Sequence, residues 1–308
     1  MINKNSKIFI AGATGMVGSS LKRIFLKKKF NNVLSPSRKS LNLLDQKKVF
    51  RYLKYHKPDI VFLAAGYVGG ININNINKAN FIYENLQIQN NVIHGSHLAD
   101  IQKLFFMGSS CIYPKFSKQP IKESELLNGK LEQTNEPYAV AKIAGVKLCQ
   151  SYNFQYKREY ISIMPPNLYG PNDNYNLETA HVLPALIRKT YEAKKNNKTY
   201  IEIWGNGKSL REFMHVDDLA EACLFLLKQK NLHDIINVGS GIEINILNLL
   251  QIIMKIAKVN LKITKKIDMP NGTPRKILDS SYIKKLGWKP KISLKNGLKT
   301  VYLKYNTK

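Results

Sequence analysis

The stretch Ile8-Phe9-Ile10-Ala11-Gly12-Ala13-Thr14-Gly15-Met16-Val17-Gly18 decides the fold. A short apolar run leads into a Gly-x-x-Gly-x-x-Gly turn, and a helical pattern follows it. Glycines at such a turn let the backbone approach a pyrophosphate, and the first N–H groups of the helix add donors and partial positive charge. A glycine triplet alone is weak evidence, but its place between a first strand and a helix makes it specific. We therefore predict a dinucleotide site formed by Gly12, Thr14, Gly15, Met16, Val17 and Gly18.

The first half of the chain alternates short apolar runs with helical patterns. We predict strands at residues 7–11, 32–35, 60–64, 103–109 and 160–165, and helices at 15–28, 46–54, 81–98 and 138–156. Such an order is typical of the α/β class, with a doubly wound parallel sheet covered by helices on both faces. It predicts a Rossmann domain over residues 1–165.

Proline and glycine punctuate the chain after about residue 165. Helical patterns at 181–195, 216–228 and 246–257 are mixed there with short strands. We predict a smaller, mostly C-terminal substrate-binding lobe over residues 166–308, with some later segments returning to the first domain. It should pack over the carboxyl ends of the strands, where open α/β sheets bind their ligands.

Composition narrows the class of protein. The 308 residues are 44% apolar, yet no run approaches the roughly 18 apolar residues that a membrane span needs. The apolar run near the N-terminus is too short for the core of a signal peptide. Three cysteines without CxxC spacing argue against a disulfide framework and a zinc site. We expect a cytoplasmic protein with no metal and no membrane association.

The formal charge of +27 raises the possibility of a nucleic-acid partner. However, only seven of the 48 basic residues are arginine, and the lysines are spread over the chain. Surfaces that read phosphates and bases usually favour arginine, whose fork binds these groups bidentately. We therefore expect no nucleic-acid binding, although the positive field would speed the association of an anionic substrate.

The segment after the second predicted strand bears on the choice of cofactor. Enzymes that use NAD commonly place an acid there for the ribose 2′-hydroxyl. This chain has Ser35-Pro36-Ser37-Arg38-Lys39, with no acid. Arg38 suits a 2′-phosphate, so we predict NADP(H); the alternative is an ordinary solvated basic loop. Asp45 has two open interpretations, a bond to adenine or a cap on the helix that begins at Gln46.

Tyr138 and Lys142 form a Tyr-x-x-x-Lys pair on one face of a predicted helix. An ammonium near a phenol favours the phenolate and lowers its pKa. A tyrosine tuned in this way can protonate the oxyanion that forms when a carbonyl is reduced. Ser109 ends the preceding strand and can hydrogen-bond the same oxygen. The set predicts carbonyl chemistry.

The order of glycine turn, Ser109, Tyr138 and Lys142 resembles the extended short-chain dehydrogenase/reductase family. Longer runs resemble its sugar-nucleotide epimerase/reductases over essentially the whole chain. These runs are Gly108-Ser109-Ser110-Cys111-Ile112-Tyr113-Pro114, Thr134-Asn135-Glu136-Pro137-Tyr138-Ala139-Val140-Ala141-Lys142, Asn167-Leu168-Tyr169-Gly170-Pro171, Arg211-Glu212-Phe213-Met214-His215-Val216-Asp217-Asp218 and Gly272-Thr273-Pro274-Arg275-Lys276.

The resemblance implies a reaction on GDP-4-keto-6-deoxy-D-mannose, in which C3 and C5 are epimerised and C4 is then reduced with NADPH to give GDP-L-fucose. Ser109, Tyr138 and Lys142 would form the reductase triad. Cys111 would be the base that removes protons beside the carbonyl, and His181 the acid that returns them. One oxygen site can serve both steps, because stabilising the enolate oxygen acidifies the neighbouring C–H bonds. The alternatives are a buried, inert Cys111 and a capping or packing His181.

The resemblance also assigns binding positions. Cofactor contacts would come from Lys142, Pro165, Asn167, Leu168 and His181, in addition to the glycine turn and Arg38. Contacts to the GDP-sugar would come from Lys189, Trp204, Arg211, Asn271 and Arg275. A homodimer through helices near 81–98 and 138–156 is implied as well. Three residues depart from the family pattern, Thr14 for arginine, Pro166 for threonine and Asn271 for aspartate.

Two other functions remain open at this point. One is an enzyme of the same build acting on another GDP-4-keto-deoxy sugar, such as a colitose-forming one. The other is a dehydrogenase-like module that binds RNA, suggested by the charge. The complete Ser109, Tyr138 and Lys142 set argues against the RNA-binding module, which has no need of these groups.

Overall fold

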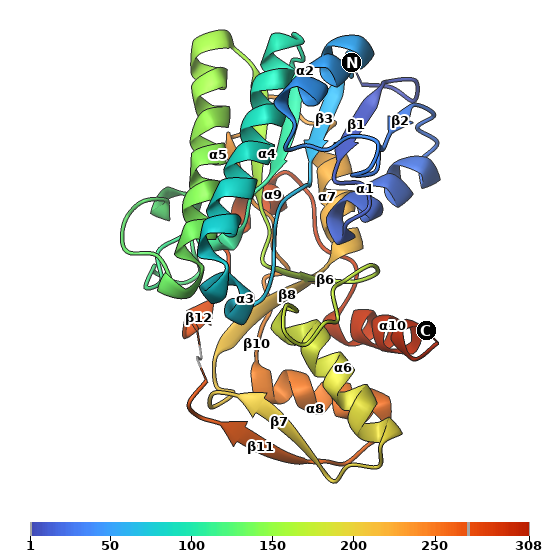
Figure 1. Ribbon diagram of the computed structural model, residues 1–308, viewed down its shortest axis with the longest axis vertical. Helices are drawn as coiled ribbons and strands as arrows, with labels where there is room; N and C mark the ends of the chain where they lie inside the picture. Colours follow the sequence, from blue (N-terminus) through green and yellow to red (C-terminus); the bar gives the residue numbers. More distant parts are fainter. Residues whose placement is uncertain (1, 270–271, 308) are drawn as a thin grey trace.

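A six-stranded parallel sheet forms the upper part of the molecule (Figure 1). The computed structural model describes residues 2–269 and 272–307. The strands lie in the order β2-β1-β3-β4-β5-β9. Their bounds are Ile8–Ala11 (β1), Val33–Leu34 (β2), Ile60–Leu63 (β3), Lys103–Met107 (β4), Glu159–Met164 (β5) and Ile235–Asn237 (β9). The chain runs outward from β1 to β2 and then returns past β1 to β3, so the strand order reverses between β1 and β3. Ligands of open α/β sheets bind at such a switch point.

The sheet is buried on both faces because its strands alternate between two cores. In β1, Ile8 and Ile10 join one core, and Phe9 and Ala11 join the other. The first core is covered by α1 (Met16–Lys27) and α7 (Val216–Leu226), and the second by α2 (Gln46–His56), α4 (Lys78–Leu98) and α5 (Glu136–Tyr156). The predicted doubly wound α/β fold is confirmed, with element ends shifted by at most a few residues.

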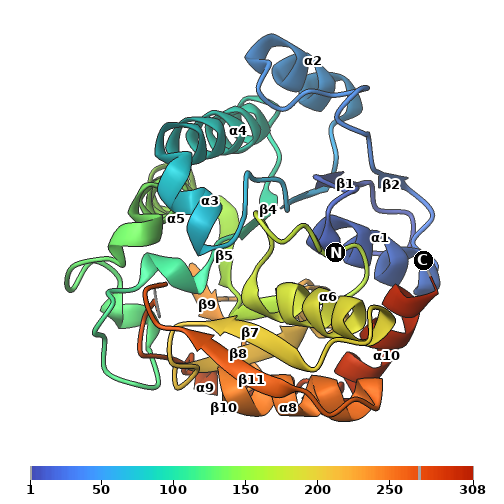
Figure 2. The same ribbon diagram turned by 60° about the horizontal axis from the view of Figure 1, so that its bottom comes forward.

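A second lobe lies below the large sheet in the view of Figure 1 and is seen from another side in Figure 2. Its central strand is β8 (Leu210–His215), which pairs with strands on both sides. The partners are β6 (Asn167–Tyr169), β10 (Glu243–Asn245) and β12 (Arg275–Lys276), and a separate pair joins β7 (Tyr200–Trp204) to β11 (Lys262–Lys266). The helices α6 (Val182–Lys195), α8 (Ile246–Ala257) and α10 (Leu294–Asn306) enclose a third core with these strands. Two short helices complete the fold, α3 (Ile71–Ile76) and α9 (Ser281–Lys285).

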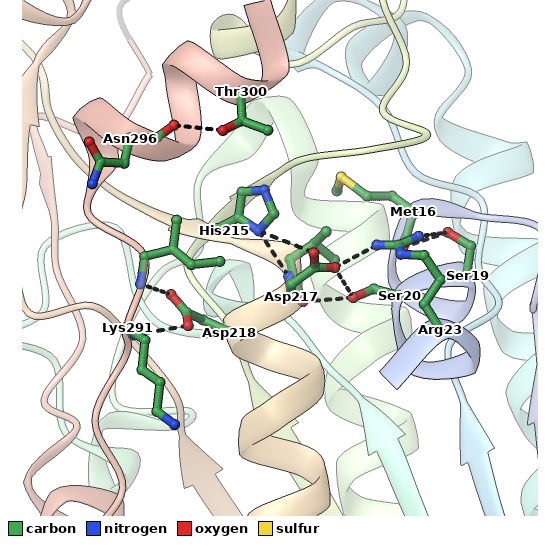
Figure 3. Close-up of polar contacts among 12 residues, drawn as sticks. Met16, Ser19, Ser20, Arg23, His215, Asp217, Asp218, Lys291, Asn296 and Thr300 are labelled. Carbon is green, nitrogen blue, oxygen red and sulfur yellow. Dashed lines mark hydrogen bonds and ion pairs between the residues drawn. The ribbon is translucent and has the colours of Figure 1, made fainter. Parts of the chain in front are cut away.

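Segments from the second half return to the large sheet. Strand β9 pairs with β5, and α7 packs beside α1. Asp217 at the start of α7 accepts hydrogen bonds from Ser20 and Arg23 of α1 (Figure 3). The next residue, Asp218, accepts from the backbone N–H groups of Lys291 and Ile292. The helix that follows the glycine turn is therefore tied, through α7, to the segment that leads into α10.

Two features of the described residues concern membrane spanning and metal binding. Within residues 2–269 and 272–307, no helix combines the length and apolarity that crossing a bilayer requires. The same part of the chain holds no group of three or more His, Cys, Asp or Glu side chains placed to bind a metal ion. Cys149 and Cys223 are fully buried in the cores.

Candidate active site

A cavity of about 400 Å³ opens at the switch point between β1 and β3. Gly12 has a φ of +92°, and a Cβ there would lie 2.6 Å from the backbone nitrogen of Ala65. A side chain on Gly18 would collide with the carbonyl oxygen of Gly12, so this glycine lets α1 pack closely behind the turn. Gly12, Thr14, Gly15, Met16 and Val17 all line the cavity. The result is a cradle of bare backbone at a helix N-terminus, which fits a dinucleotide pyrophosphate.

The far end of this cavity carries positive charge. Arg38 lines it with a side chain that is 75% exposed and lies 4.0 Å from the Glu84 carboxylate of α4. None of the described residues that line the cavity is acidic. Asp45 is not among them; its Oδ1 accepts a hydrogen bond of 3.1 Å from the Lys48 N–H and caps α2. The capping interpretation of Asp45 is confirmed, and the lining fits a 2′-phosphate.

The proton-transfer residues gather at the carboxyl end of β4. Ser109 follows this strand in an extended conformation, and Tyr138 and Lys142 lie in the first turns of α5. A side chain on Gly145 would lie 2.6 Å from the ring of Phe106, so this glycine lets α5 approach β4 closely. The Lys142 Nζ is buried and donates a 2.9 Å hydrogen bond to the Met107 carbonyl. Packing of α5 on β4 thus brings the three predicted residues together at the cavity.

The pKa values of Tyr138 and Lys142 differ from those expected from the sequence. Burial raises the pKa of Tyr138, the neighbouring Cys111 adds to that effect, and a hydrogen bond with Ser109 only partly offsets it. Burial lowers the pKa of Lys142 to about 8. The expected lowering of the Tyr138 pKa by Lys142 is wrong for this structure, because the Lys142 Nζ is 5.9 Å from the ring centroid and is held by Met107. The phenol is therefore protonated at neutral pH, which is the form that can donate a proton.

Cys111 lies two residues beyond Ser109 and lines the cavity. Its sulfur accepts hydrogen bonds from the Asn135 Nδ2 at 3.2 Å and from the Lys276 Nζ at 3.4 Å. Burial alone would raise the pKa of the thiol. The Lys276 charge and the hydrogen bonds from Ser109, Lys276 and Asn135 outweigh burial, so the pKa is lowered. A thiol held in this way is far from the inert, buried cysteine of the alternative interpretation.

His181 is the residue before α6, where the chain passes between the lobes. Its side chain makes no capping hydrogen bond, so the capping interpretation does not hold. The side chain lines the cavity from the side of the second lobe. Enclosure by the protein, with a smaller effect of the Lys276 charge, lowers the pKa of His181 to about 4. The side chain remains open to the cavity, and its resting form at neutral pH is the uncharged imidazole.

A second cavity of about 210 Å³ lies between the two lobes. Lys189, Trp204 and Arg211 line it from α6, β7 and β8 respectively. The Lys189 Nζ is 5.9 Å from the ring centroid of Trp204. Both cavities are lined by Gly69, Asn74, Cys111, Tyr138, Asn167, Leu168 and His181. The two spaces therefore meet at the residues predicted to carry the chemistry.

Some of the remaining predicted binding residues line a cavity and others do not. Pro165, Asn167 and Leu168 line the first cavity, and so does Pro166. Arg275 is not among the residues that line either cavity; it is exposed, with its Nε 2.8 Å from the Glu243 carboxylate. Asn271 lies outside the described residues.

Two residues around the sulfur had no role in the sequence-based prediction. Asn135 precedes α5, and Lys276 follows Arg275 in β12. Successive residues of a strand point to opposite sides, so a strand at 275–276 allows only one of the two to face the cavity. Recognising that short strand would have favoured Lys276 as the inward residue once Arg275 was placed outside.

Comparison with known proteins places the chain in a family. The profile of the NAD dependent epimerase/dehydratase family matches residues 8–239. The chain belongs to this family, which agrees with the resemblance seen in the sequence.

Individual relatives match along almost the whole chain. It is 49% identical to GDP-L-fucose synthase 1 from Arabidopsis thaliana over 98% of this chain and 94% of that protein. It is 38% identical to GDP-L-colitose synthase from Yersinia pseudotuberculosis over 95% of each. Among solved structures, it resembles GDP-mannoheptose C4 reductase from Campylobacter jejuni with NADP bound, with a TM-score of 0.91 and 39% identity over 99% of both chains.

Proposed function

We propose that this chain is an NADPH-dependent sugar-nucleotide epimerase/reductase that converts GDP-4-keto-6-deoxy-D-mannose into GDP-L-fucose. The observation that carries the proposal is the meeting of Cys111, Tyr138 and His181 where the two cavities join. The 49% identity to a GDP-L-fucose synthase along nearly the full chain supports the choice of substrate.

The first cavity would hold NADP(H). The N–H groups at the start of α1 would bind the pyrophosphate, and Arg38 would bind the 2′-phosphate. Pro165, Asn167 and Leu168 would border the reactive ring, with Lys142 and His181 nearby. When bound, the cofactor supplies the hydride that reduces C4 of the sugar.

The second cavity would hold the GDP-sugar. Arg211 and Lys189 supply positive charge for the diphosphate, and Trp204 supplies an aromatic face for the guanine. Asn271 and Arg275 complete the proposed set, although Arg275 must leave Glu243 to reach the ligand. We also propose the division of labour between residues 1–165, with returning segments, and residues 166–308.

Epimerisation requires a base and an acid on opposite sides of the sugar. The Cys111 thiolate removes the proton from C3 or C5, and the electron pair moves into an enolate. Ser109 and Tyr138 hold the enolate oxygen by hydrogen bonds. His181, once protonated, returns a proton to the other face of the same carbon, so the configuration inverts with no net change in atoms.

Reduction uses the same oxygen site. As C4 is reduced, the phenol of Tyr138 gives its proton to the C4 oxygen and a hydroxyl group results. The raised pKa of Tyr138 keeps that proton in place until the oxyanion develops. Lys142, held by the Met107 carbonyl, lines the cavity beside Tyr138 and completes the proposed triad.

Deuterated water tests the epimerase half of the proposal. The wild-type enzyme should place solvent deuterium at C3 and C5, as read by mass spectrometry and NMR of the product. Cys111→Ser replaces the thiol by a hydroxyl too weakly acidic to be the base, so exchange should collapse. His181→Asn should slow the formation of epimerised product more than it slows exchange.

The same experiment distinguishes the second candidate. The similarity to a GDP-mannoheptose C4 reductase favours a plain C4 reductase as that candidate. A Cys111→Ser enzyme that still makes the L-sugar at the wild-type rate would remove Cys111 from the mechanism. A panel of GDP-4-keto-deoxy sugars, including the colitose precursor, then identifies the preferred substrate.

We further propose a cytoplasmic homodimer joined through α4 and α5. These helices expose apolar side chains that a partner copy would cover: Tyr83, Leu98, Val140, Phe154 and Tyr156. The three free cysteines, one of them with a lowered pKa, fit a reducing compartment. Sedimentation of the wild type and of Phe154→Glu tests the dimer, because a charge at this interface should shift the protein to monomers.

A further inference from the structure

The position of Lys276 beside the Cys111 sulfur is built into the backbone. Lys276 is the last residue of β12, and its register partner in β8 is Arg211. The fully buried Glu212 of β8 fixes the chain just beyond, because its carboxylate accepts the Leu278 N–H at 2.9 Å and the Gly241 N–H at 2.7 Å. The half-buried Lys276 side chain can therefore reach the cavity from a defined anchor.

Several groups face the Cys111 sulfur from the elements around it. Ser109 lies on the loop after β4, Asn135 and Tyr138 at the start of α5, and Arg211 on β8. His181 enters from the start of α6 and lines the same space. Among the described groups that hydrogen-bond the sulfur, Lys276 alone carries a formal charge.

We propose that Lys276 is a positioning residue that holds the Cys111 sulfur as a thiolate through its 3.4 Å contact with that sulfur. The inference deepens the proposed function and rests on it.

The role of Lys276 separates epimerisation from reduction. Tyr138 keeps its proton without the thiolate, because burial is the largest cause of its raised pKa. Loss of the Lys276 charge should therefore slow the removal of protons from the sugar while C4 reduction continues. A residue that only binds the diphosphate would instead affect substrate affinity in both steps.

Alkylation of Cys111 by iodoacetamide as a function of pH measures the thiolate directly, without sugar or cofactor. Cys149 and Cys223 are fully buried, and Cys111→Ser provides the blank. An opposite charge at hydrogen-bond distance lowers a pKa by about one to three units. Lys276→Met should therefore move the alkylation midpoint to higher pH by about one unit or more and slow the reaction at pH 7 about tenfold.

Two further variants and a control complete the test. Lys276→Arg retains the charge and should keep a midpoint close to that of the wild type, whereas Lys276→Gln should behave like Lys276→Met. Lys118→Met removes a lysine from the exposed surface of the loop after Cys111 and should change nothing. Equal losses in the Arg, Gln and Met variants, or an unchanged midpoint in all three, would overturn the proposal.

Solvent deuterium exchange then separates this inference from the proposed function. If wild-type enzyme exchanges C3 and C5 protons, Lys276→Met should exchange at least about tenfold more slowly at pH 7 and recover at higher pH. Exchange unaffected by Lys276→Met would sink the inference and leave the proposed function standing. A wild type that reduces the sugar without any exchange would sink the epimerase, while the alkylation result would still report on the thiolate.

Discussion

The two cavities are built in different ways, although they share one set of residues. The first cavity, proposed for NADP(H), is called the cofactor cavity here, and the second the sugar-nucleotide cavity. The cofactor cavity is formed largely by the ends of neighbouring strands. The glycine turn, residues 64–66 and residues 107–111 lie side by side because parallel strands end at one edge. The sugar-nucleotide cavity draws on α3, the start of α5, α6, β7, β8 and β12, which are far apart in sequence. Local sequence patterns therefore define the first cavity, and only tertiary packing defines the second.

The two cavities also differ in the charged side chains that line them. No acidic side chain of the described residues lines the cofactor cavity. The sugar-nucleotide cavity combines Lys189, Arg211 and Lys276 with Glu132, whose carboxylate is 2.9 Å from the Lys115 Nζ. Since Lys115 largely neutralises Glu132, the cavity keeps a surplus of positive charge for a diphosphate. We therefore expect a substitution in one cavity to weaken binding of one ligand only. A substitution where the cavities meet should impair the reaction itself.

The largest expected effect lies at the junction. Tyr138→Phe keeps the ring and removes the proton donor, so turnover should fall by about two to four orders of magnitude. The affinity for NADPH should change little, because the proposed cofactor contacts are the N–H groups of α1 and Arg38 rather than the phenol. Steady-state kinetics and cofactor titration measure both. Near-normal turnover would remove Tyr138 from its role.

A substitution in the sugar-nucleotide cavity should affect one ligand only. Arg211→Met removes a charged donor of about 1.5–3 kcal/mol in hydrogen bonding, which corresponds to roughly a ten- to hundredfold rise in KM for the GDP-sugar. NADPH binding should be unchanged, because Arg211 does not line the cofactor cavity. A matching loss of NADPH affinity would show that the two cavities are not separable. Glu243→Gln releases Arg275 on the neighbouring strand and should lower the KM rather than raise it, because Arg275 belongs to the proposed ligand contacts.

The sequence predicted the first cavity better than the second, for physical reasons. The strands before Gly12 and Ser109 are short, apolar apart from Lys103, and bounded by turns, so their order and their common edge follow from pattern alone. The pair at 275–276 is a two-residue strand, and Glu212 binds the chain just beyond it at Leu278; no periodicity reveals either feature. The pKa of Tyr138 also required coordinates, because the distance and hydrogen bond of Lys142 decide whether burial or charge dominates.

The smallest expected effect lies at the outer end of the cofactor cavity. Arg38 is 75% exposed and only 4.0 Å from Glu84, so its pairing with a 2′-phosphate competes with solvent and with that carboxylate. Arg38→Ala should therefore reduce the preference for NADPH over NADH by about tenfold, without changing exchange at C3 and C5 when NADPH is saturating. Glu84→Gln should act in the opposite direction and strengthen NADPH binding, because it removes the competing charge. Titration of both cofactors against the wild type and the two variants measures the ratio. A wild type that prefers NADH would contradict the assignment of Arg38, and a ratio unchanged in Arg38→Ala would move the 2′-phosphate contact to another basic residue of the same loop, such as Lys39.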